Sequence, residues 1–513
     1  MATAPKDIIR EIQELFLSDS LPWIVGYSGG KDSTASLQLI WTALSKLPPD
    51  RRRFKKVYVI STDTLVENPV ISLWVTLSLQ LMSMAASKQG LNIEARQLTP
   101  ELENRFWVNL VGKGYPAPRP MFRWCTDRLK ISASTKFIQN LSEANGEAIL
   151  VLGQRRGESQ ARDKVIENYK SSTRERLSRN KDPKLSRVWV YLPIETWTSD
   201  DVWEYLIETP NPWGNSNQEL FDLYRGATPD AECPIVVDKS TPSCGDSRFG
   251  CYVCTMVSQD KSMQAMIHND EAKAWMQPIM DFRDRYLAVK DHEFREFKRI
   301  GGHITWKHGK LVPGPYTQER RAELLTELLK TQELVRTHPG NASLELIKLD
   351  ELEEIRRIWV EEKGEIEDLL PELYEAATGH EYPGRELDAM PLESTDLALL
   401  HEAAQEWIAD NSPAVDAVPG DERSTELYKL TRSLLTTGFR GMQSRKRSKQ
   451  LDQLQKVLRD YAFFDRQDAV AFAEKYLADA AATRGPDEAL DDEADPAGER
   501  DVIPITPIAA VVG

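Results

Sequence analysis

The sequence predicts an open, doubly wound α/β domain with a parallel sheet, followed by a Cys-rich segment and an all-helical domain. Over residues 1–230, short apolar runs alternate with helical patterns, which is typical of buried parallel strands joined by crossover helices. From residue 263 onward strand signals nearly vanish, and helical spacing with charge pairing takes over. A chain of 513 residues is long enough for two or three such domains.

The elements of the first domain follow in order along the chain. Nearly continuous apolar runs predict strands, and the amphipathic stretches between them predict helices. The predicted strands are 23–28, 57–62, 92–98 and 147–155, and two of the predicted helices are 33–47 and 68–89. We expect the carboxyl ends of these strands to form the ligand-binding edge, as in other open α/β sheets.

The remaining residues divide by composition. We predict a PP-loop-type α/β domain over 1–230, a Cys segment over 231–262, a helical domain over 263–484, and a tail over 485–513. The tail begins acidic and poor in apolar residues, so we predict disorder there. Its apolar end, DVIPITPIAAVVG, is either a docking tail or a segment without a role. Predicted helical segments are 265–299, 318–336, 344–377, 393–410, 422–435, 447–463 and 466–482.

The net charge of −15 is local rather than general. Residues 345–375 carry −8 and residues 487–499 carry −7, so the rest of the chain is balanced. Basic residues gather at 162–187 and 431–450, which we expect to hold a polyanion such as DNA. The mean hydropathy of −0.47 and the lack of a long apolar run predict no membrane-spanning helix. Without a secretion signal, the chain is expected to be cytoplasmic.

A glycine-containing loop follows the first predicted strand. Ser28-Gly29-Gly30-Lys31-Asp32-Ser33 joins that strand to a helix. The glycines allow a tight turn, the helix N-terminus offers free N–H groups, and Lys31 adds positive charge, which together favour a phosphate. The spacing differs from a Walker A loop, because Asp32 follows Lys31. An ordinary strand–helix turn is the alternative.

Polar side chains follow two other predicted strands. Asp63 comes at the end of the second strand, where it is either a nucleotide contact or a turn cap. Arg155, Arg156 and Arg162 follow the fourth strand, and their planar guanidinium groups suit phosphate. A solvated basic loop is the alternative for these arginines.

Four of the five cysteines are clustered, with the spacing C-x10-C-x6-C-x2-C. They are Cys233, Cys244, Cys251 and Cys254. Disulfides are rare in a reducing cytosol, so the cluster predicts a metal centre, either tetrahedral zinc or a [4Fe–4S] cube. Cys125 stands apart in sequence. Arg123, Arg128 and Lys130 surround it, so we expect a lowered thiol pKa and a reactive thiolate, with a small core residue as the alternative.

Several of these stretches resemble a known superfamily in order, over residues 20–260. The loop SGGKDS resembles the PP-loop of the ATP pyrophosphatases, which cleave ATP between the α and β phosphates. Further stretches resemble its PAPS-reductase-like branch: Ser61-Thr62-Asp63-Thr64, Arg123-Trp124-Cys125-Thr126 with Leu129-Lys130, Gly153 to Ser159 with Arg162, and Pro193-Ile194 with Trp197 and Asp201-Val202-Trp203. The text around Cys244 and around Arg248 to Thr255 resembles the iron–sulfur segment of the DndC-type DNA phosphorothioation sulfurtransferases.

The resemblance implies cofactors, partners and site residues. ATP, with Mg²⁺, would be bound by Ser28, Gly29, Gly30, Lys31, Asp32, Ser33, Asp63, Gly153, Arg155 and Arg162, and a [4Fe–4S] cluster by Cys233, Cys244, Cys251 and Cys254. Asp32, Arg155 and Cys125 are the predicted catalytic residues. DNA, a cysteine desulfurase that donates sulfur, and other phosphorothioation subunits of the DndD and DndE type would be the partners.

The function expected from this resemblance is ATP-dependent replacement of a backbone oxygen of DNA by sulfur. Three alternatives stay open: a PAPS or APS reductase, a tRNA thiolation enzyme, and a non-catalytic iron–sulfur subunit that binds DNA and gates a partner ATPase. Against the reductase, the last cysteine is Cys254, so no Cys-containing C-terminal tail exists in the sequence.

Overall fold

The computed structural model describes most of the chain and divides it into two compact units. The described residues are 2–120, 122–156, 173–174, 176–228, 249–307, 309–385, 394–411, 422–443, 447–463, 465–483 and 503–505. The first unit comprises Met1–Phe106, Ala117–Ala288 and Leu334–Leu346, and the second comprises Trp107–Pro116, Val289–Glu333 and Ile347–Gly513. Each unit therefore collects segments that are separate in sequence, whereas the four-part division by composition stays a prediction.

A seven-stranded sheet forms the centre of the first unit, with the strand order β3-β2-β1-β4-β7-β6-β5. The first five in that order are parallel: β3 (Ile93–Leu98), β2 (Val57–Thr62), β1 (Trp23–Gly26), β4 (Ala148–Val151) and β7 (Val188–Tyr191). The last two, β6 (Leu177–Arg179) and β5 (Thr173–Arg174), run antiparallel. The four predicted strands are confirmed. Among the three added strands, β5 and β6 have two and three residues, too few for a clear period in sequence, whereas β7 has four, as β1 and β4 do.

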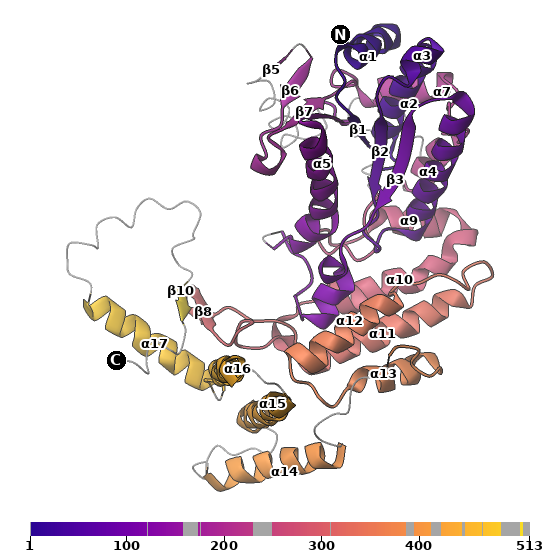
Figure 1. The fold of residues 1–513 in the computed structure, drawn as a ribbon. Helices are drawn as coiled ribbons and strands as arrows, with labels where there is room; N and C mark the ends of the chain where they lie inside the picture. The colour runs from indigo at the N-terminus through magenta and orange to yellow at the C-terminus, as the bar shows by residue number, and fades with distance from the viewer. Residues whose placement is uncertain are drawn as a thin grey trace. The chain divides into compact units, whose positions relative to one another are not determined.

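Helices cover both faces of this sheet, which confirms the doubly wound α/β prediction. From β1 the chain moves outward through α2 (Lys31–Ser45) to β2 and through α4 (Pro69–Gln89) to β3. It then returns through α5 (Ser132–Asn145) to β4, on the other side of β1. Because such crossovers are right-handed, the reversal places α5 on the opposite face. Figure 1 shows α4 and α5 on either side of β1, β2 and β3.

The reversal of direction creates the binding edge. The chain leaves β1 toward β2 on one side, while β4 pairs with β1 on the other, with Val25 opposite both Val59 and Val151. Ligands of open α/β sheets bind beyond the carboxyl ends of strands at such a switch point. The loop after β1 and the arginines after β4 lie at this point.

Helix α4 is long and apolar enough, by length and composition alone, to cross a membrane. The expectation of no membrane-spanning helix stays a prediction, because the core helix of a soluble domain passes the same test. One face of α4 is buried in the first unit: Ile71, Val75, Leu79 and Met82 are buried and the helix packs against β3.

Other helices of the first unit include α1 (Pro5–Ser18), α7 (Ser199–Glu208) and α8 (Asn217–Gly226). Helix α7 begins with a capping box, in which Thr198 and Asp201 satisfy each other's backbone N–H groups. The predicted continuous helix over 265–299 is broken instead into α9 (Lys261–Asn269), α10 (Gln277–Phe282) and single turns. Pro278 at the second position of α10 explains one of these breaks.

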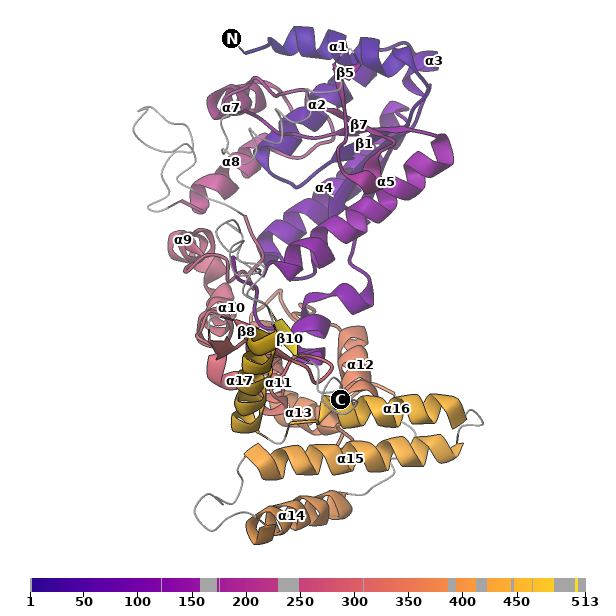
Figure 2. The same cartoon turned by 90° about the vertical axis from the view of Figure 1, so that its left-hand side faces the viewer.

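The second unit is mainly helical, as predicted. Its helices are α11 (Gln318–Arg336), whose last turn passes into the first unit, α12 (Leu349–Arg357), α13 (Leu369–Thr378), α14 (Ser394–Asn411), α15 (Glu422–Gln443), α16 (Arg447–Asp460) and α17 (Arg466–Thr483). Helix α15 packs against both α14 and α16, and Figure 2 shows the three side by side.

A small sheet in the second unit was not predicted. Strand β8 (Ile304–Lys307) pairs with β9 (Lys310–Leu311) and, in antiparallel register, with β10 (Ile503–Ile505). Ile503–Ile505 of the apolar segment thus pair with β8, and the docking role of the whole segment stays a prediction. Ile304 packs in a core with Phe297, Phe463, Ala469 and Ala473. The predicted acidic disordered stretch before β10 lies outside the described residues.

Candidate functional site

The loop Ser28–Ser33 has a fixed shape at the carboxyl end of β1. Gly29 has φ of 75°, and a Cβ there would lie 2.5 Å from Val75 Cγ2, so both backbone and space require glycine. The Ser28 amide donates to Ser33 Oγ (3.2 Å), and Ser33 Oγ donates to the Gly30 carbonyl (3.0 Å). These contacts hold the first turn of α2, whose N-cap Gly30 has no side-chain cap. The loop therefore presents a helix N-terminus prepared for an anion.

Arg155 and Asp32 meet across this edge. Arg155 Nε donates to Asp32 Oδ1 at 2.6 Å, and Arg155 Nη2 lies 3.5 Å from Oδ2. Lys31 Nζ lies 3.5 Å from the same Asp32 carboxylate. Arg155 is only 6% exposed. Two predicted catalytic residues, separated by more than a hundred positions, are therefore one ion pair beside the phosphate loop.

Gly153 allows the strand end after β4 to touch the loop. A Cβ at position 153 would lie 2.7 Å from the Asp32 carbonyl oxygen and 2.9 Å from the Ser33 amide nitrogen. Both are backbone atoms, which a rotamer change cannot move. Gly153 is thus required for close packing of the loop, and its predicted contact with a nucleotide stays a prediction.

Two aromatic residues that sequence reasoning missed also hold the loop. Tyr224 on α8 accepts a hydrogen bond from the Lys31 amide through its hydroxyl (3.3 Å), and Lys31 Nζ lies 5.4 Å from the centre of its ring. Trp74 on α4 donates from Nε1 to the Gly29 carbonyl (3.1 Å). Neither residue belongs to a recognisable local motif, and Tyr224 comes 193 positions after Lys31. No sequence signal connects them to the loop.

Asp63 caps a turn at the end of β2. Its Oδ1 accepts from the Leu65 amide (2.8 Å), and Leu65 has a positive φ of 64°. Its Oδ2 accepts from Gln97 Nε2 (3.3 Å). Here the structure has the turn-cap arrangement given as the alternative for Asp63. The role of Asp63 in nucleotide binding stays a prediction.

Other predicted arginines are placed only in part. Arg156 pairs with Glu195 (2.6 Å), and Arg162 lies outside the described residues, as do Gly157 to Ser159. Arg432, in the basic stretch 431–450, is buried and pairs with Glu367. Its guanidinium lies in the core of the second unit, so the expectation that this stretch holds DNA is wrong at this residue.

The last two cysteines of the cluster are fixed beside the end of β2. The Tyr252 amide donates to the Val66 carbonyl (3.0 Å), and the Asn68 amide donates to the Gly250 carbonyl (3.3 Å). Cys251 Sγ lies 3.4 Å from Thr64 Oγ1, and the Cys254 amide donates to the Cys251 carbonyl (3.0 Å) in a tight turn. The Cys251–Cys254 pair therefore lies at the carboxyl edge of the same sheet as the phosphate loop.

Cys125 lies near this pair, although it stands apart in sequence. The thiols of Cys251, Cys125 and Cys254 all act electrostatically on Lys130. Burial lowers the pKa of Lys130, but Glu67 and the thiols, when they are ionised, outweigh burial, so the pKa is raised overall. Burial also raises the pKa of Glu67, which lies 3.9 Å from Lys130 Nζ.

The expected lowering of the Cys125 pKa is wrong. Burial raises the pKa of the Cys125 thiol, and the neighbouring Cys254 adds to the rise. Arg128, one of the expected cations, donates to Asn104 Oδ1 instead (3.0 Å). Burial likewise raises the pKa of Cys251 to about 11. Without an added positive charge, these thiols are protonated at neutral pH.

The predicted ligand set is described only in half. Cys233 and Cys244 lie outside the described residues. Within the described part of the chain, no group of three or more His, Cys, Asp and Glu side chains is arranged to hold a metal ion. Cys251 and Cys254 supply two thiols in the short loop that a shared metal or cluster requires, so the described half fits such a site.

The sequence and structure were compared with known proteins. Residues 22–256 match the phosphoadenosine phosphosulfate reductase domain family. A Methanocaldococcus jannaschii protein, named uncharacterized protein MJ0066, is 27% identical over 217 residues, which are 42% of this chain and 38% of that protein. The chain thus spans well under half the length of this relative.

Solved structures with similar folds include three proteins, each covering part of this chain. A PAPS reductase from Candida auris has 14% identity and a TM-score of 0.25, over 41% of this chain and 82% of its own. The U34-tRNA thiolase NcsA from Methanococcus maripaludis, solved with its [4Fe–4S] cluster, has 16% identity and a TM-score of 0.24, over 42% and 70%. An FMN adenylyltransferase from Candida glabrata has 11% identity and a TM-score of 0.26, over 44% of this chain and 60% of its own.

The family match covers the parallel sheet, the phosphate loop, Arg155 and the Cys251–Cys254 turn together. Residues 22–256, a little under half of the chain, are therefore similar to a PAPS reductase domain in sequence, and they form the α/β domain that carries the phosphate loop.

Proposed function

We propose that this protein is the sulfurtransferase of DNA phosphorothioation, which activates a DNA backbone phosphate with ATP and replaces a non-bridging oxygen by sulfur. The observation that carries the proposal is the placement of a phosphate loop and a cysteine pair along one edge of one sheet. The loop is held by Asp32 and Arg155, and the cysteine pair is held by the turn after β2. Nucleotide activation and sulfur chemistry thus have their groups in one domain.

The first step is adenylation of the DNA phosphate. A non-bridging oxygen of DNA attacks the α phosphorus of ATP, the bond to the β phosphate breaks, and pyrophosphate leaves. Backbone N–H groups at the start of α2 and the hydroxyls of Ser28 and Ser33 hold the departing pyrophosphate. Lys31 and Arg155 offset the charge that develops there, and Asp32 orients both cations. Mg²⁺ is expected on the phosphates.

The second step exchanges oxygen for sulfur. A sulfur nucleophile attacks the DNA phosphorus, and the oxygen that carries the adenylyl group leaves as AMP. If the sulfur arrives as a persulfide from a cysteine desulfurase, a second thiol must then form a disulfide to release the phosphorothioate. Cys125, near Cys251 and Cys254, is our candidate for a sulfur-carrying residue.

The iron–sulfur cluster is part of the proposal and supplies sulfur or redox chemistry when it is bound. Cys251 and Cys254 would hold it together with Cys233 and Cys244. The position of Cys125 near Cys254 makes it a further candidate ligand. Lys130 and Glu67 lie at the same place and would set the charge around the cluster.

DNA and other proteins complete the proposal. We assign the basic stretch 162–187 to DNA binding. In the second basic stretch, 431–450, Arg432 is buried and is therefore left out of the proposed DNA contact. A cysteine desulfurase and other subunits of the modification complex, of the DndD and DndE type, are the proposed partners. The cytoplasm is the proposed location, because reactive thiols and the cluster need a reducing compartment.

Mass spectrometry of nucleic acids from the host tests this function. DNA and tRNA are digested with nucleases from cells with and without this chain. We expect phosphorothioate-linked dinucleotides to disappear from DNA when the chain is absent and to return with the wild-type chain. Unchanged DNA together with lost thiolated nucleosides in tRNA would favour the tRNA thiolase, and a shift in sulfite metabolism would favour the reductase. Return of the dinucleotides with a chain that carries Asp32→Asn would favour the non-catalytic reading.

A further inference from the structure

The second unit encloses a cavity that the proposed function does not use. Its volume is about 850 Å³, within the range of small-molecule sites. The wall comes from the loop Glu296–Gly302, the start of α11, the segment Ile358–Glu365, and helices α15 and α16. All of these segments belong to the second unit.

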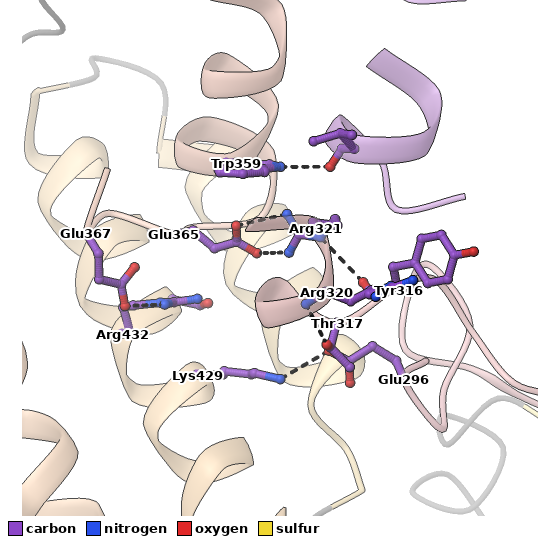
Figure 3. Close-up of polar contacts among 12 residues, drawn as sticks. Glu296, Tyr316, Thr317, Arg320, Arg321, Trp359, Glu365, Glu367, Lys429 and Arg432 are labelled. Atoms are coloured by element: carbon purple, nitrogen blue, oxygen red, sulfur yellow. Dashed lines mark hydrogen bonds and ion pairs between the residues drawn. The ribbon is translucent and has the colours of Figure 1, made fainter. Parts of the chain in front are cut away.

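Most charged side chains of the wall are paired within the protein. Arg321 and Glu365 form a buried bidentate pair, with Nη1 3.1 Å from Oε2, and Lys429 Nζ lies 3.1 Å from Glu296. Lys298 pairs with Glu426, and Arg432 pairs with Glu367. Figure 3 shows three of these pairs, Arg321–Glu365, Lys429–Glu296 and Arg432–Glu367. Glu361 and Glu362 pair with Arg357, and Asp460 lies 3.9 Å from Arg459.

Lys363 and Arg299 are two wall cations outside these pairs. Like Lys456, they make no ion pair with a carboxylate among the residues that the structure describes. Arg299 donates from Nη1 to the Pro313 carbonyl (2.8 Å), which leaves its positive charge without a counter-ion. Arg299 is partly buried, so its charge is only partly solvated, and a bound anion would neutralise it.

The electrostatics of Lys363 follow from its neighbours. Burial lowers its pKa to about 8, and the positive charge of Arg321 acts in the same direction. Glu365, Glu296 and Glu362 act in the opposite direction and do not compensate. Glu365 and Glu296 are already engaged by Arg321 and Lys429. The cavity therefore presents an amine that is partly neutral near pH 8, and a bound anion would favour its charged form.

The loop beside these cations is held in one shape by its own backbone: the Gly302 amide donates to the Arg299 carbonyl (3.0 Å) and the Arg299 amide to the His303 carbonyl (2.8 Å). Gly301 and Gly302 both have positive φ, 90° and 78°, so two successive residues are left-handed. A Cβ at Gly302 would lie 2.3 Å from Asp460 Cα, which shows that this loop packs directly on the end of α16. The loop is thus held in place while Arg299 and Lys298 extend from its start.

We propose that this cavity is a second binding site, for a small phosphate-bearing anion held by Lys363 and Arg299. The described lining residues include eight cations and six carboxylates, so the wall carries a net positive charge and favours an anion over a cation. Arginine and lysine together recognise tetrahedral oxyanions well, because guanidinium bonds bidentately and ammonium acts as a point charge. The site uses none of the residues of the phosphate loop, so it stands whether or not the proposed sulfur transfer is correct.

Pyridoxal 5′-phosphate is the probe, because it carries both a phosphate and an aldehyde. In the site, the Lys363 amine adds to the aldehyde, water leaves, and borohydride reduces the imine to a stable secondary amine. Peptide mapping of the full chain then reads each lysine separately, so labelling at Lys31 in the phosphate loop does not interfere. We expect Lys363 to be labelled faster than Lys330, an exposed lysine on α11 that pairs with Glu327.

Competition and a variant decide the outcome. Inorganic pyrophosphate at ten times its Kd should reduce labelling of Lys363 about tenfold and leave Lys330 unchanged. In the Lys31→Ala background, pyrophosphate should still raise the melting temperature, and adding Lys363→Met should abolish that rise, whereas Lys330→Met should not. Equal labelling of Lys363 and Lys330, no protection, or the same rise with Lys363→Met would overturn the proposal. Protection by short duplex DNA but not by pyrophosphate would also overturn it, since the cavity would then serve the DNA backbone.

Discussion

Arg155 Nε lies 2.6 Å from Asp32 Oδ1, which joins the turn after β4 to the first turn of α2. Asp32 follows β1 and Arg155 follows β4. These two strands are parallel neighbours, at the point where the strand order of the sheet reverses. The pair fixes a cation beside a helix N-terminus, and Lys31 adds a second cation to the same carboxylate. This arrangement holds positive charge where a pyrophosphate would leave, without letting either cation turn away.

Gly153→Ala should displace the phosphate loop. The added Cβ would meet backbone atoms of Asp32 and Ser33 at less than 3 Å, so the loop must shift, at a cost of about 1–3 kcal/mol. We expect ATP binding, measured by calorimetry, to be lost or strongly weakened. Gly226→Ala is the control, because no atom lies within 4 Å of its Cβ position and its φ is not positive. Equal ATP affinity in both variants would contradict the role given to Gly153.

Tyr224→Phe should weaken nucleotide binding without unfolding the protein. The variant keeps the ring under Lys31 Nζ and removes only the hydroxyl that accepts from the Lys31 amide. A single hydrogen bond contributes about 1 kcal/mol, which is roughly fivefold in the Kd for ATP. Tyr205→Phe on α7 is a matched control with no predicted effect on ATP. If both variants bind ATP as the wild type does, Tyr224 does not position the loop.

Cys251→Ser and Cys254→Ser should each remove bound iron. The two thiols share one turn beside Thr64, so a lost thiolate cannot be replaced by another from the same turn. We expect the visible absorbance of an anaerobically purified iron–sulfur protein to fall in both variants, with iron and sulfide falling together. Cys125→Ser decides the role of the fifth cysteine: lost absorbance makes it a ligand, and retained absorbance with lost sulfur transfer makes it a carrier. Zinc in place of iron in the wild type would refute the cluster.

Glu365→Gln should destabilise the second unit at neutral pH. Burial raises the pKa of Glu365, but Arg321 and other cations outweigh burial, so the pKa is lowered below its usual 4.5. A carboxylate with a lowered folded-state pKa contributes stability above about pH 4.5 and loses it as pH falls through the folded value. Removing one partner of a buried pair costs about 3–5 kcal/mol.

Urea unfolding of both proteins at several pH values measures this effect. The difference between wild type and Glu365→Gln should be full at pH 7 and shrink in acid, when Glu365 itself is protonated. Glu323→Gln is the control, since Glu323 is about half exposed and its pair with Arg320 should contribute at most about 1 kcal/mol. A constant difference from pH 7 to pH 3 would contradict the ion-pair account.

Local patterns predicted the fold and the loop well. The predicted strand 57–62 coincides with β2, and the predicted helix 318–336 coincides with α11, because apolar period and length are properties of the chain itself. Arg155 was predicted to face the loop because parallel strands share a carboxyl edge, and the structure has it there. Strand β7 has four residues, as β1 and β4 have, so its length does not explain why it was missed, whereas β5 and β6 are too short to show a period.

Long-range contacts and burial were beyond sequence reasoning. Tyr224 contacts the loop from a helix far along the chain, and nothing near it in sequence indicates this. Cys125 was expected to be an activated thiolate because cations surround it in sequence, yet burial raises its pKa. Arg432 was assigned to a DNA surface from a run of basic residues, yet it is buried against Glu367. In each case the environment comes from residues distant in sequence.

Product analysis of ATP turnover tests the central claim most directly. The full chain is incubated with Mg²⁺, duplex DNA and ATP labelled at the α phosphate, with wild type and Asp32→Asn compared. We predict AMP and pyrophosphate in equal amounts from the wild type, and neither above background from Asp32→Asn, which leaves Arg155 without its carboxylate. Release of ADP and inorganic phosphate, or undiminished AMP from Asp32→Asn, would contradict a pyrophosphatase site built on Asp32 and Arg155.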